Sequence, residues 1–349
     1  MPVSVIVGGQ FGSEGKGKVA YLFAQERKAA MAIRVGGPNS GHTVVDPLRG
    51  PIVFRQLPTS AILPNVHCVL PAGTYLLEEL LLREIALADI DSSRLSIDPR
   101  AVLISEGLID SERHAGLEAR IGSTLSGTGA AVVSRCSRDG QTKFAEGSKR
   151  LKAFVRDTPP LLAKAIDSGK RVVVEGTQGF GLSVLHSPYY PFATSRDTTA
   201  SGALSEAGLS PLVVDEVVLV IRAFPIRVAG NSGPLPHEAT WEDLALQAGS
   251  EHPFREFTSV TGKLRRVAAF DPSIVRRAIQ HNRPSTIVLN HLDYVDAKCN
   301  AGGPLTVRAA EFLQRVEAEI GQEIDLVGLD PRTLRATDAK SRTAIAYGT

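Results

Sequence analysis

The chain has few of the residues that mark specialised classes of protein. Its 349 residues include only three cysteines, two methionines and one tryptophan. Cys68, Cys136 and Cys299 are widely separated and lack the spacing of a metal site. We therefore expect reduced thiols in a cytoplasmic protein rather than a disulfide framework.

Long apolar runs and an excess of one charge are also missing. No apolar stretch approaches the roughly 20 residues of a membrane-spanning helix, and we expect residues 1–3 to begin the fold without a signal peptide. The 39 basic and 37 acidic residues leave a net charge of +2, which favours neither nucleic acid nor a membrane as partner. With 43% hydrophobic residues the chain can bury a large core, and we expect residues 1–349 to form a single domain.

The most informative stretch lies at the start of the chain. Residues 3–7 are uncharged and mainly β-branched, which predicts a strand buried in a parallel sheet. A turn with glycines at positions 8, 9, 12, 15 and 17 follows, and a helix is expected over 18–28. Glycines let backbone N–H groups approach an anion, and a helix N-terminus adds positive potential. With mobile positive charge from Lys16 and Lys18, this stretch predicts a phosphate-binding loop.

This loop resembles a P-loop but differs from it in one residue. Residues 12–18 fit the spacing Gly-x4-Gly-Lys, but the next residue is Val19. A P-loop has serine or threonine there, and its hydroxyl binds magnesium. A P-loop kinase or GTPase is therefore disfavoured, and magnesium at this loop would need other ligands.

Strands and helices alternate along the rest of the chain. This alternation predicts an α/β fold with a large, mainly parallel central β-sheet flanked by helices. Strands are expected at residues 32–35, 66–70, 101–105, 171–175, 213–223 and 286–290, and helices at 78–87, 151–168 and 272–280.

Several of the expected strands lead into polar loops. Residues 36–43 are rich in glycine and contain His42, an imidazole that we expect to titrate near neutrality. Lys263, Arg265 and Arg266 follow a Thr-Gly turn and suit a dianionic ligand such as a dicarboxylate. Taken alone, each loop fits a solvated surface turn better than a binding site, so their combination carries the prediction.

The combination resembles the adenylosuccinate synthetases. That family has Gly-Asp-Glu-Gly-Lys-Gly-Lys where this chain has Gly12-Ser-Glu-Gly-Lys-Gly-Lys18, and Gly-Gly-x-Asn-Ala-Gly-His-Thr at residues 36–43. Further matches are to Ile-Gly-Thr-Thr-Gly-Arg-Gly-Ile-Gly at 121–129, Glu-Gly-Ala-Gln-Gly at 175–179, Thr-Tyr-Pro-Tyr-Val-Thr-Ser-Ser-Asn at 189–197, and a Thr-Gly-Arg-Arg-Arg-Arg loop at 261–266. The resemblance implies the adenylosuccinate synthetase fold.

The resemblance also implies a role for each matching position. The resemblance implies that the catalytic residues are Ser13, Lys16, His42 and Gln178, with His42 as the general acid. The expected donor-nucleotide site comprises Gly12, Glu14, Gly15, Lys16, Gly17, Lys18, Gly41, His42, Thr43, Arg265, Asn290, His291, Leu292, Asp293 and Gly328. The expected acceptor-nucleotide site comprises Ser13, Asn39, Ser40, Thr124, Arg138, Gln178, Thr194 and Lys263. The expected aspartate site comprises Ser259, Val260, Thr261, Gly262, Lys263 and Arg265.

Two further expectations follow from the resemblance. Mg²⁺ is expected to bind Ser13 and the Gly41 carbonyl. A homodimer is also expected, because the family's counterpart of Arg138 reaches the nucleotide of the neighbouring subunit.

Ser13 is the most important departure from the family pattern. The family has aspartate there, which takes the proton from N1 of IMP before the six-oxygen attacks the γ-phosphate of GTP. Serine is too weak a base to replace that carboxylate, so a different substrate is expected. One branch of the family, the phage 2-aminoadenylosuccinate synthetases, acts on dGMP. The two-amino group of guanine lies beside N1, where serine leaves more room than a carboxylate.

These residues predict the reaction dGMP + L-aspartate + ATP → 2-amino-2′-deoxyadenylosuccinate + ADP + phosphate, for synthesis of 2-aminoadenine DNA. His291 replaces the lysine that stacks on the base in guanine-binding proteins, which favours ATP or dATP over GTP. A phage-encoded enzyme would act in the host cytoplasm. Two alternatives remain, an ordinary adenylosuccinate synthetase that uses IMP and GTP, and a non-catalytic nucleotide-binding relative. The presence of Lys16, His42, Gln178 and Arg265 together disfavours the second.

Overall fold

The computed structural model describes residues 2–258, 262–300 and 302–337 and is built around a nine-stranded sheet. Among these residues, every neighbouring pair in the sheet is parallel except β15–β16. In spatial order the strands are β16 (Arg335–Ala336), β15 (Leu326–Val327), β14 (Thr286–Asn290), β10 (Val214–Arg222), β1 (Val3–Gly8), β9 (Val172–Gly179), β2 (Met31–Arg34), β5 (His67–Leu70) and β7 (Leu95–Ile97).

Helices flank this sheet, and smaller sheets extend it. The α-helices are α1 (Lys16–Glu26), α2 (Glu78–Ala88), α3 (Glu106–His114), α4 (Leu117–Ile121), α5 (Thr128–Ser137), α6 (Thr158–Asp167), α7 (Ala200–Ala207), α8 (Trp241–Ala248), α9 (Pro272–Asn282) and α10 (Val307–Ile320). The remaining strands are the hairpin β3 (His42–Asp46) and β4 (Gly50–Phe54), the pair β6 (Tyr75–Leu76) and β8 (Val102–Leu103), and the sheet of β11 (Ile226–Arg227), β13 (Arg266–Ala268) and β12 (Glu238–Ala239). Short 3-10 helices are η1 (Thr59–Ile62), η2 (Ala145–Gly147), η3 (Phe180–Leu182), η4 (Pro211–Val213) and η5 (Leu292–Tyr294).

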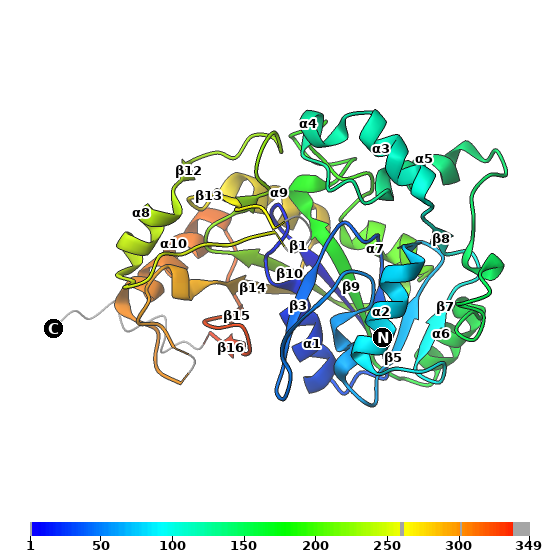
Figure 1. Cartoon of the computed structure of the whole chain (residues 1–349). Helices are drawn as coiled ribbons and strands as arrows, with labels where there is room; N and C mark the ends of the chain where they lie inside the picture. Colours follow the sequence, from blue (N-terminus) through cyan, green and yellow to red (C-terminus); the bar gives the residue numbers. More distant parts are fainter. Residues whose placement is uncertain (1, 259–261, 301, 338–349) are drawn as a thin grey trace.

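The central strand β1 is buried on both faces. Val3, Val5 and Val7 belong to the largest apolar cluster, while Ile6 points to a second cluster that includes α1 residues. This alternation follows from the twofold period of a strand, and burial of both faces explains the uncharged, β-branched sequence. In Figure 1, β14, β15 and β16 lie on one side of β1, and β5 and β7 lie on the other.

The predicted fold class is confirmed, with two local differences. Residues 102–103 do not join the central sheet, because a turn closed by Ala101 N–H and the Asp98 carbonyl turns the chain away after β7. The helix expected from residue 151 begins at Thr158, since Pro159 and Pro160 suit only its first turn, where N–H groups need no partner. Among the described residues, no helix is long and apolar enough to cross a membrane.

The parallel strands bring distant parts of the sequence to one edge of the sheet. β1, β9, β10 and β14 run side by side, so their carboxyl ends at Gly8, Gly179, Arg222 and Asn290 lie along the same edge. Ligands of open α/β sheets bind beside such ends. The glycine-rich loop after β1, the polar residues that end β9 and those that follow β14 lie at this edge.

Candidate active site

The loop after β1 is shaped as an anion cradle. Gly12 and Gly15 both have φ of +90°, in the left-handed region that glycine adopts without strain, and Ser13 between them has φ of +58°. Helix α1 begins at Lys16 with no side-chain cap. The N–H groups of its first turn therefore remain available to a ligand, and the helix dipole favours a negative one.

The two lysines of this loop are fixed in place rather than mobile. Lys16 is 2% exposed, and its Nζ lies 2.6 Å from Oε2 of Glu14, which is fully buried. Lys18 Nζ donates to the carbonyls of Asp330, at 2.9 Å, and Thr333, at 3.2 Å. Burial lowers the pKa of Lys18 to about 8. The expectation of mobile lysines is wrong because both aliphatic stems pack inside the protein and both ammonium groups already have partners.

Glu14 also shapes the loop itself. Its Oε1 accepts hydrogen bonds from the N–H groups of Gln10, at 3.1 Å, and Gly12, at 2.8 Å. The sequence predicts that Glu14 belongs to the donor-nucleotide site, but its side chain points away from the cavities. Glu14 can therefore act on a ligand only through Lys16 and the loop backbone.

His42 lies at the start of β3, over a buried network of polar groups. Its Nδ1 lies 2.6 Å from Oε1 of Glu175, which also accepts from Arg34 at 2.8 Å. The other oxygen of Glu175 accepts from the N–H and the hydroxyl of Thr59, both at 2.8 Å. A carboxylate beside Nδ1 holds the proton on that nitrogen, which leaves Nε2 free for a ligand.

The pKa of His42 differs from the sequence expectation. Burial, together with the charge of Arg34, lowers the pKa of His42 to about 4, so the prediction that it titrates near neutrality is wrong. The free protein therefore holds a neutral imidazole. Negative phosphate charge beside the ring would raise this pKa again, because an opposite charge favours the protonated form.

Ser13 is held between arginines. Its hydroxyl accepts a hydrogen bond from Arg265, and its carbonyl accepts one from Arg222 at 3.0 Å. Arg222 also pairs with Glu256, whose Oε2 lies 3.2 Å from Nη1 of Arg222 and 3.8 Å from Nη1 of Arg265. Although burial raises the pKa of Glu256, the charge of Arg222 lowers it to about 2 on balance. Glu256 is therefore engaged with the arginines.

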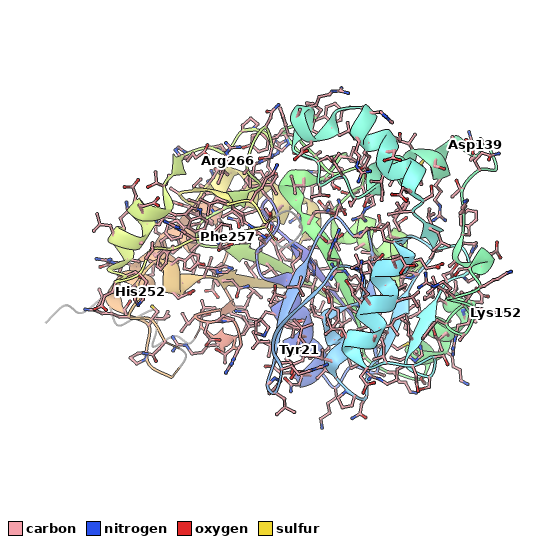
Figure 2. The ribbon with its side chains drawn as sticks, in the orientation of Figure 1. Tyr21, Asp139, Lys152, His252, Phe257 and Arg266 are labelled. Carbon is pink, nitrogen blue, oxygen red and sulfur yellow. The ribbon has the colours of Figure 1, made fainter. Side chains whose placement is uncertain are left out.

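Three cavities meet at the phosphate loop. The first, which we call the loop cavity, has a volume of about 450 Å³. Besides Ser13, it brings together most of the predicted donor residues: Gly15, Lys16, Gly17, Lys18, Gly41, His42, Thr43, Arg265, Asn290, His291 and Asp293. Phe257 and Tyr294 also line this cavity, and Figure 2 shows Phe257 toward the middle of the view.

The second cavity, the central cavity of about 110 Å³, joins the first to the third. It shares Ser13, Lys16, Gly41, His42 and Arg265 with the loop cavity. Other predicted residues in its lining are Gly12, Asn39, Ser40, Thr124 and Gln178. The third, the outer cavity of about 360 Å³, shares Asn39, Thr124 and Gln178 with the central one and adds Thr194. Two ligands placed in the loop and outer cavities would thus meet beside all four predicted catalytic residues.

Some predicted residues lie elsewhere. Leu292 is part of the apolar core, and Gly328 packs against Asn290 and Lys18. Arg138 is exposed at the end of α5 and lines none of the three cavities. Lys263 pairs with Glu118 at 2.7 Å and lines a neighbouring cavity that also contains Thr124.

The expected aspartate loop falls partly outside the described residues. Ser259, Val260 and Thr261 are not among the residues that the structure describes. Gly262 follows them on an exposed turn with φ of +64°.

Several site residues were missed from the sequence. Arg34, Thr59 and Glu175 support His42, Arg222 and Glu256 hold Ser13, and Arg227 lines the central and outer cavities. For two of these residues, the sequence contained an indication that they have a buried partner. Glu175 and Arg222 each directly follow a run of apolar strand residues, where burial demands a partner for a charge.

Oxygen ligands for a metal are few. The described part of the chain has no group of three or more His, Cys, Asp and Glu side chains that could hold a metal ion. Ser13 and Gly41 both line the loop and central cavities. Their oxygens suit Mg²⁺, which commonly takes its remaining ligands from phosphates and water.

The buried histidines lead to a prediction about pH. Burial lowers the pKa of His42 to about 4 and that of His291 to about 3, whereas histidine in an unfolded chain titrates near 6.5. As pH falls from about 7 toward 5, the unfolded chain takes up protons that the folded chain refuses. We therefore expect the melting temperature of the ligand-free protein to fall over this range.

The control separates this effect from other titrating groups. Burial raises the pKa of Asp293 to about 6, so this carboxyl takes up a proton in the folded chain and offsets part of the histidine effect below that pH. His291→Asn should flatten the slope, because asparagine tolerates the positive φ of this position. His252→Asn, at an exposed site, should leave it unchanged. Equal slopes in His291→Asn and the parent would contradict the prediction.

The fold and the joined cavities define an α/β protein with two large cavities that meet, through a smaller one, beside one glycine-rich loop. The family model for adenylosuccinate synthetase matches residues 5–144 and 141–301. The chain therefore belongs to the adenylosuccinate synthetase family, and it is an enzyme of the carbon–nitrogen ligase class.

Relatives match along nearly the whole chain. The adenylosuccinate synthetase of Archaeoglobus fulgidus is 32% identical over 97% of this chain and 99% of its own length. That of Methanocaldococcus jannaschii is 34% identical over 97% of each chain. These relatives show the family and the general activity.

Two solved structures share the fold. The succinoaminodeoxyadenylate synthetase of cyanophage S-2L, solved with dGMP and dATP, is 28% identical, with a TM-score of 0.82 over 98% of this chain and 97% of its own. The fully ligated adenylosuccinate synthetase of Plasmodium falciparum is 18% identical, with a TM-score of 0.84 over 97% of this chain and all of its own. At that identity the second likeness concerns the fold alone.

Proposed function

We propose that this chain joins L-aspartate to the six position of dGMP with ATP or dATP as donor, forming 2-amino-2′-deoxyadenylosuccinate, ADP or dADP, and phosphate. The observation that carries this proposal is the lining of the central cavity. Its described residues include no carboxylate, and Ser13 occupies the place of the family's aspartate. The nearby Glu14 and Glu256 are held by Lys16 and Arg222.

The absence of a carboxylate suits a guanine acceptor. A carboxylate in this cavity would face the two-amino group and N1–H of guanine, whereas a serine hydroxyl is smaller and can donate or accept a hydrogen bond. The likeness to the cyanophage enzyme, which was solved with dGMP and dATP, supports the same acceptor.

The loop cavity offers support for an adenine donor. Asn290 Nδ2 donates to the Glu14 carbonyl at 2.7 Å, and this hydrogen bond fixes the orientation of the Asn290 side-chain amide. Among the described residues, Asn290 Oδ1 is buried without a partner and lies against Gly328. Adenine has a donor at its six position, and guanine has donors at N1 and at its two-amino group, so this oxygen could bind either base. The preference for an adenine donor therefore rests on His291, which replaces the lysine that stacks on the base in guanine-binding proteins.

The residues around the central cavity divide the chemistry between them. The acceptor loses its N1 proton to a water beside Ser13, its six-oxygen attacks the γ-phosphorus of the donor, and ADP or dADP leaves; the amine of aspartate then displaces phosphate from carbon six and releases a proton to solvent. Lys16 offsets the charge that develops during phosphoryl transfer. Gln178 binds the six position. Bound phosphate raises the pKa of His42, so that Nε2 takes up a proton and donates it to an oxygen of the transferring group. Mg²⁺, held by the Ser13 hydroxyl and the Gly41 carbonyl, would neutralise phosphate charge.

Two further parts of the proposal concern binding partners. We propose that the loop around residues 258–265 binds L-aspartate, because Thr258 and Arg265 line the central cavity. We also propose a homodimer in which the exposed Arg138 reaches the acceptor site of the other subunit.

The curated archaeal relatives favour a second candidate, ordinary adenylosuccinate synthetase with IMP and GTP. The test is aspartate-dependent phosphate release with magnesium, crossing dGMP, GMP and IMP against ATP, dATP and GTP. We expect turnover with dGMP and an adenine donor, and none after chelation of magnesium. Turnover with IMP and GTP alone would establish the second candidate.

Ser13→Asp gives a matched variant for this panel. The added carboxylate should lower turnover of dGMP about tenfold or more, because its larger size crowds the two-amino group and because it draws Arg265 into an ion pair. Turnover of IMP should fall less or rise. An unchanged ratio of the two kcat/KM values would show that Ser13 does not select the acceptor.

A further inference from the structure

Arg196 is an unexpected charge beside the acceptor site. It lies in the segment 189–202, where the adenylosuccinate synthetase pattern has serine, and it is only 5% exposed. A buried arginine must find partners for its donors. Its partners lie in β9 and α7, and one of them is Gln178.

The contacts of Arg196 join three elements. Nη1 forms an ion pair with the carboxylate of Glu206 in α7. Nη2 donates to Thr177 Oγ1 at 2.6 Å and to Gln178 Oε1 at 3.1 Å, both in β9. The backbone of Gly36 makes room, since a Cβ there would lie 2.4 Å from both Arg196 Nη2 and Thr177 Oγ1. The guanidinium is thus built into the wall behind the acceptor site.

This contact decides which way the Gln178 amide faces. A side-chain amide has an acceptor end and a donor end, while a guanidinium can only donate. Oε1 must therefore face Arg196, and the two N–H donors of Nε2 point elsewhere. Gln178 lines both the central and the outer cavity, so these donors are available to an acceptor-site ligand.

We propose that Arg196 is a positioning and specificity residue. It holds Gln178 with Nε2 toward the six position of the acceptor purine, so that the site selects a six-oxo purine and rejects a six-amino purine. This inference deepens the proposed ligase function, but it applies equally to dGMP and IMP, because both are six-oxo purines.

The selection has a chemical reason. A six-oxygen accepts a hydrogen bond from Nε2, whereas a six-amino group would set N–H against N–H and leave buried donors unpaired. Such a loss costs roughly tenfold to a hundredfold in affinity. The same orientation rejects purines that already carry nitrogen at carbon six, and so limits inhibition by later compounds with a six-amino group.

The test measures binding by two matched pairs of nucleotides, dGMP against 2-amino-dAMP and IMP against AMP. We expect the parent to prefer the six-oxo member of each pair by about tenfold or more. In Arg196→Met combined with Glu206→Gln, which leaves no unpaired carboxylate, the preference should shrink to within about threefold. Arg196→Lys should restore part of it.

A second variant does not depend on removing the arginine. In Gln178→Glu the carboxylate can still accept from Arg196 but presents only acceptors to the purine, so the preference should reverse toward the six-amino member. Arg120→Met is the matched control, since Arg120 lines the outer cavity without contacting Gln178, and it should leave both ratios unchanged.

The outcomes separate this inference from the proposed function. An unchanged six-oxo preference in the Arg196 double variant, or no preference in the parent, would overturn the role of Arg196. Preference for IMP over dGMP would instead count against the proposed acceptor, while the ratios within each pair still test Arg196.

Discussion

Lys16→Met should lower kcat of the aspartate-dependent ligase reaction by about a hundredfold to a thousandfold. Lys16 is a buried cationic residue that lines both the loop and the central cavity, where we propose that the phosphate is transferred. Fixed positive groups in such water-poor sites act strongly on developing negative charge, and loss of one such group typically costs this much in rate. Single-turnover phosphate release with saturating nucleotides measures the effect.

Stability should fall as well, and a double variant separates the two effects. Lys16 and Glu14 form a buried pair at 2.6 Å, so removing the lysine leaves a buried carboxylate unpaired, at a cost of about 3–5 kcal/mol. Glu14→Gln together with Lys16→Met should recover most of that stability without recovering activity. Activity within threefold of the parent in the double variant would show that Lys16 is structural only.

Glu175→Leu should be the most destabilising of the single substitutions considered, with a loss of about 3–5 kcal/mol in the free energy of unfolding. Arg34 and Glu175 are each 1% exposed and lie 2.8 Å apart. Although burial raises the pKa of Glu175, the hydrogen bond from His42 and the charge of Arg34 lower it on balance, so the carboxylate is ionised. Without it, Arg34, His42 and Thr59 lose their common acceptor. Urea unfolding measures the change.

The controls for Glu175 use other ion pairs. Asp110→Asn breaks a pair with Arg113 in which both side chains are about half exposed, and exposed pairs contribute at most about 1 kcal/mol. Arg34→Met combined with Glu175→Leu should be more stable than Glu175→Leu alone, because no buried charge is left unpaired. A loss below about 1 kcal/mol in Glu175→Leu would contradict this account.

The sequence alone determined the sheet and the places where ligand loops leave it. Residues 3–7 and 286–290 indicate their burial directly, since an uncharged, mainly apolar run suits a strand covered on both faces. Parallel strands place their carboxyl ends at one edge, so the loops after β1 and β14 had to meet. Local glycine spacing was sufficient to locate the loop that lies beside the three cavities.

Only the tertiary structure decided what the side chains in those loops do. Glu14 and Ser13 are neighbours in sequence, yet Glu14 is buried under Lys16 while Ser13 faces the cavities. The pairs Arg34–Glu175 and Arg196–Gln178 join separate parts of the chain, and periodicity carries no information about such contacts. The neutral state of His42 likewise depends on burial and on Arg34. These properties arise from desolvation and from partners distant in sequence, so they exist only once the sheet has formed.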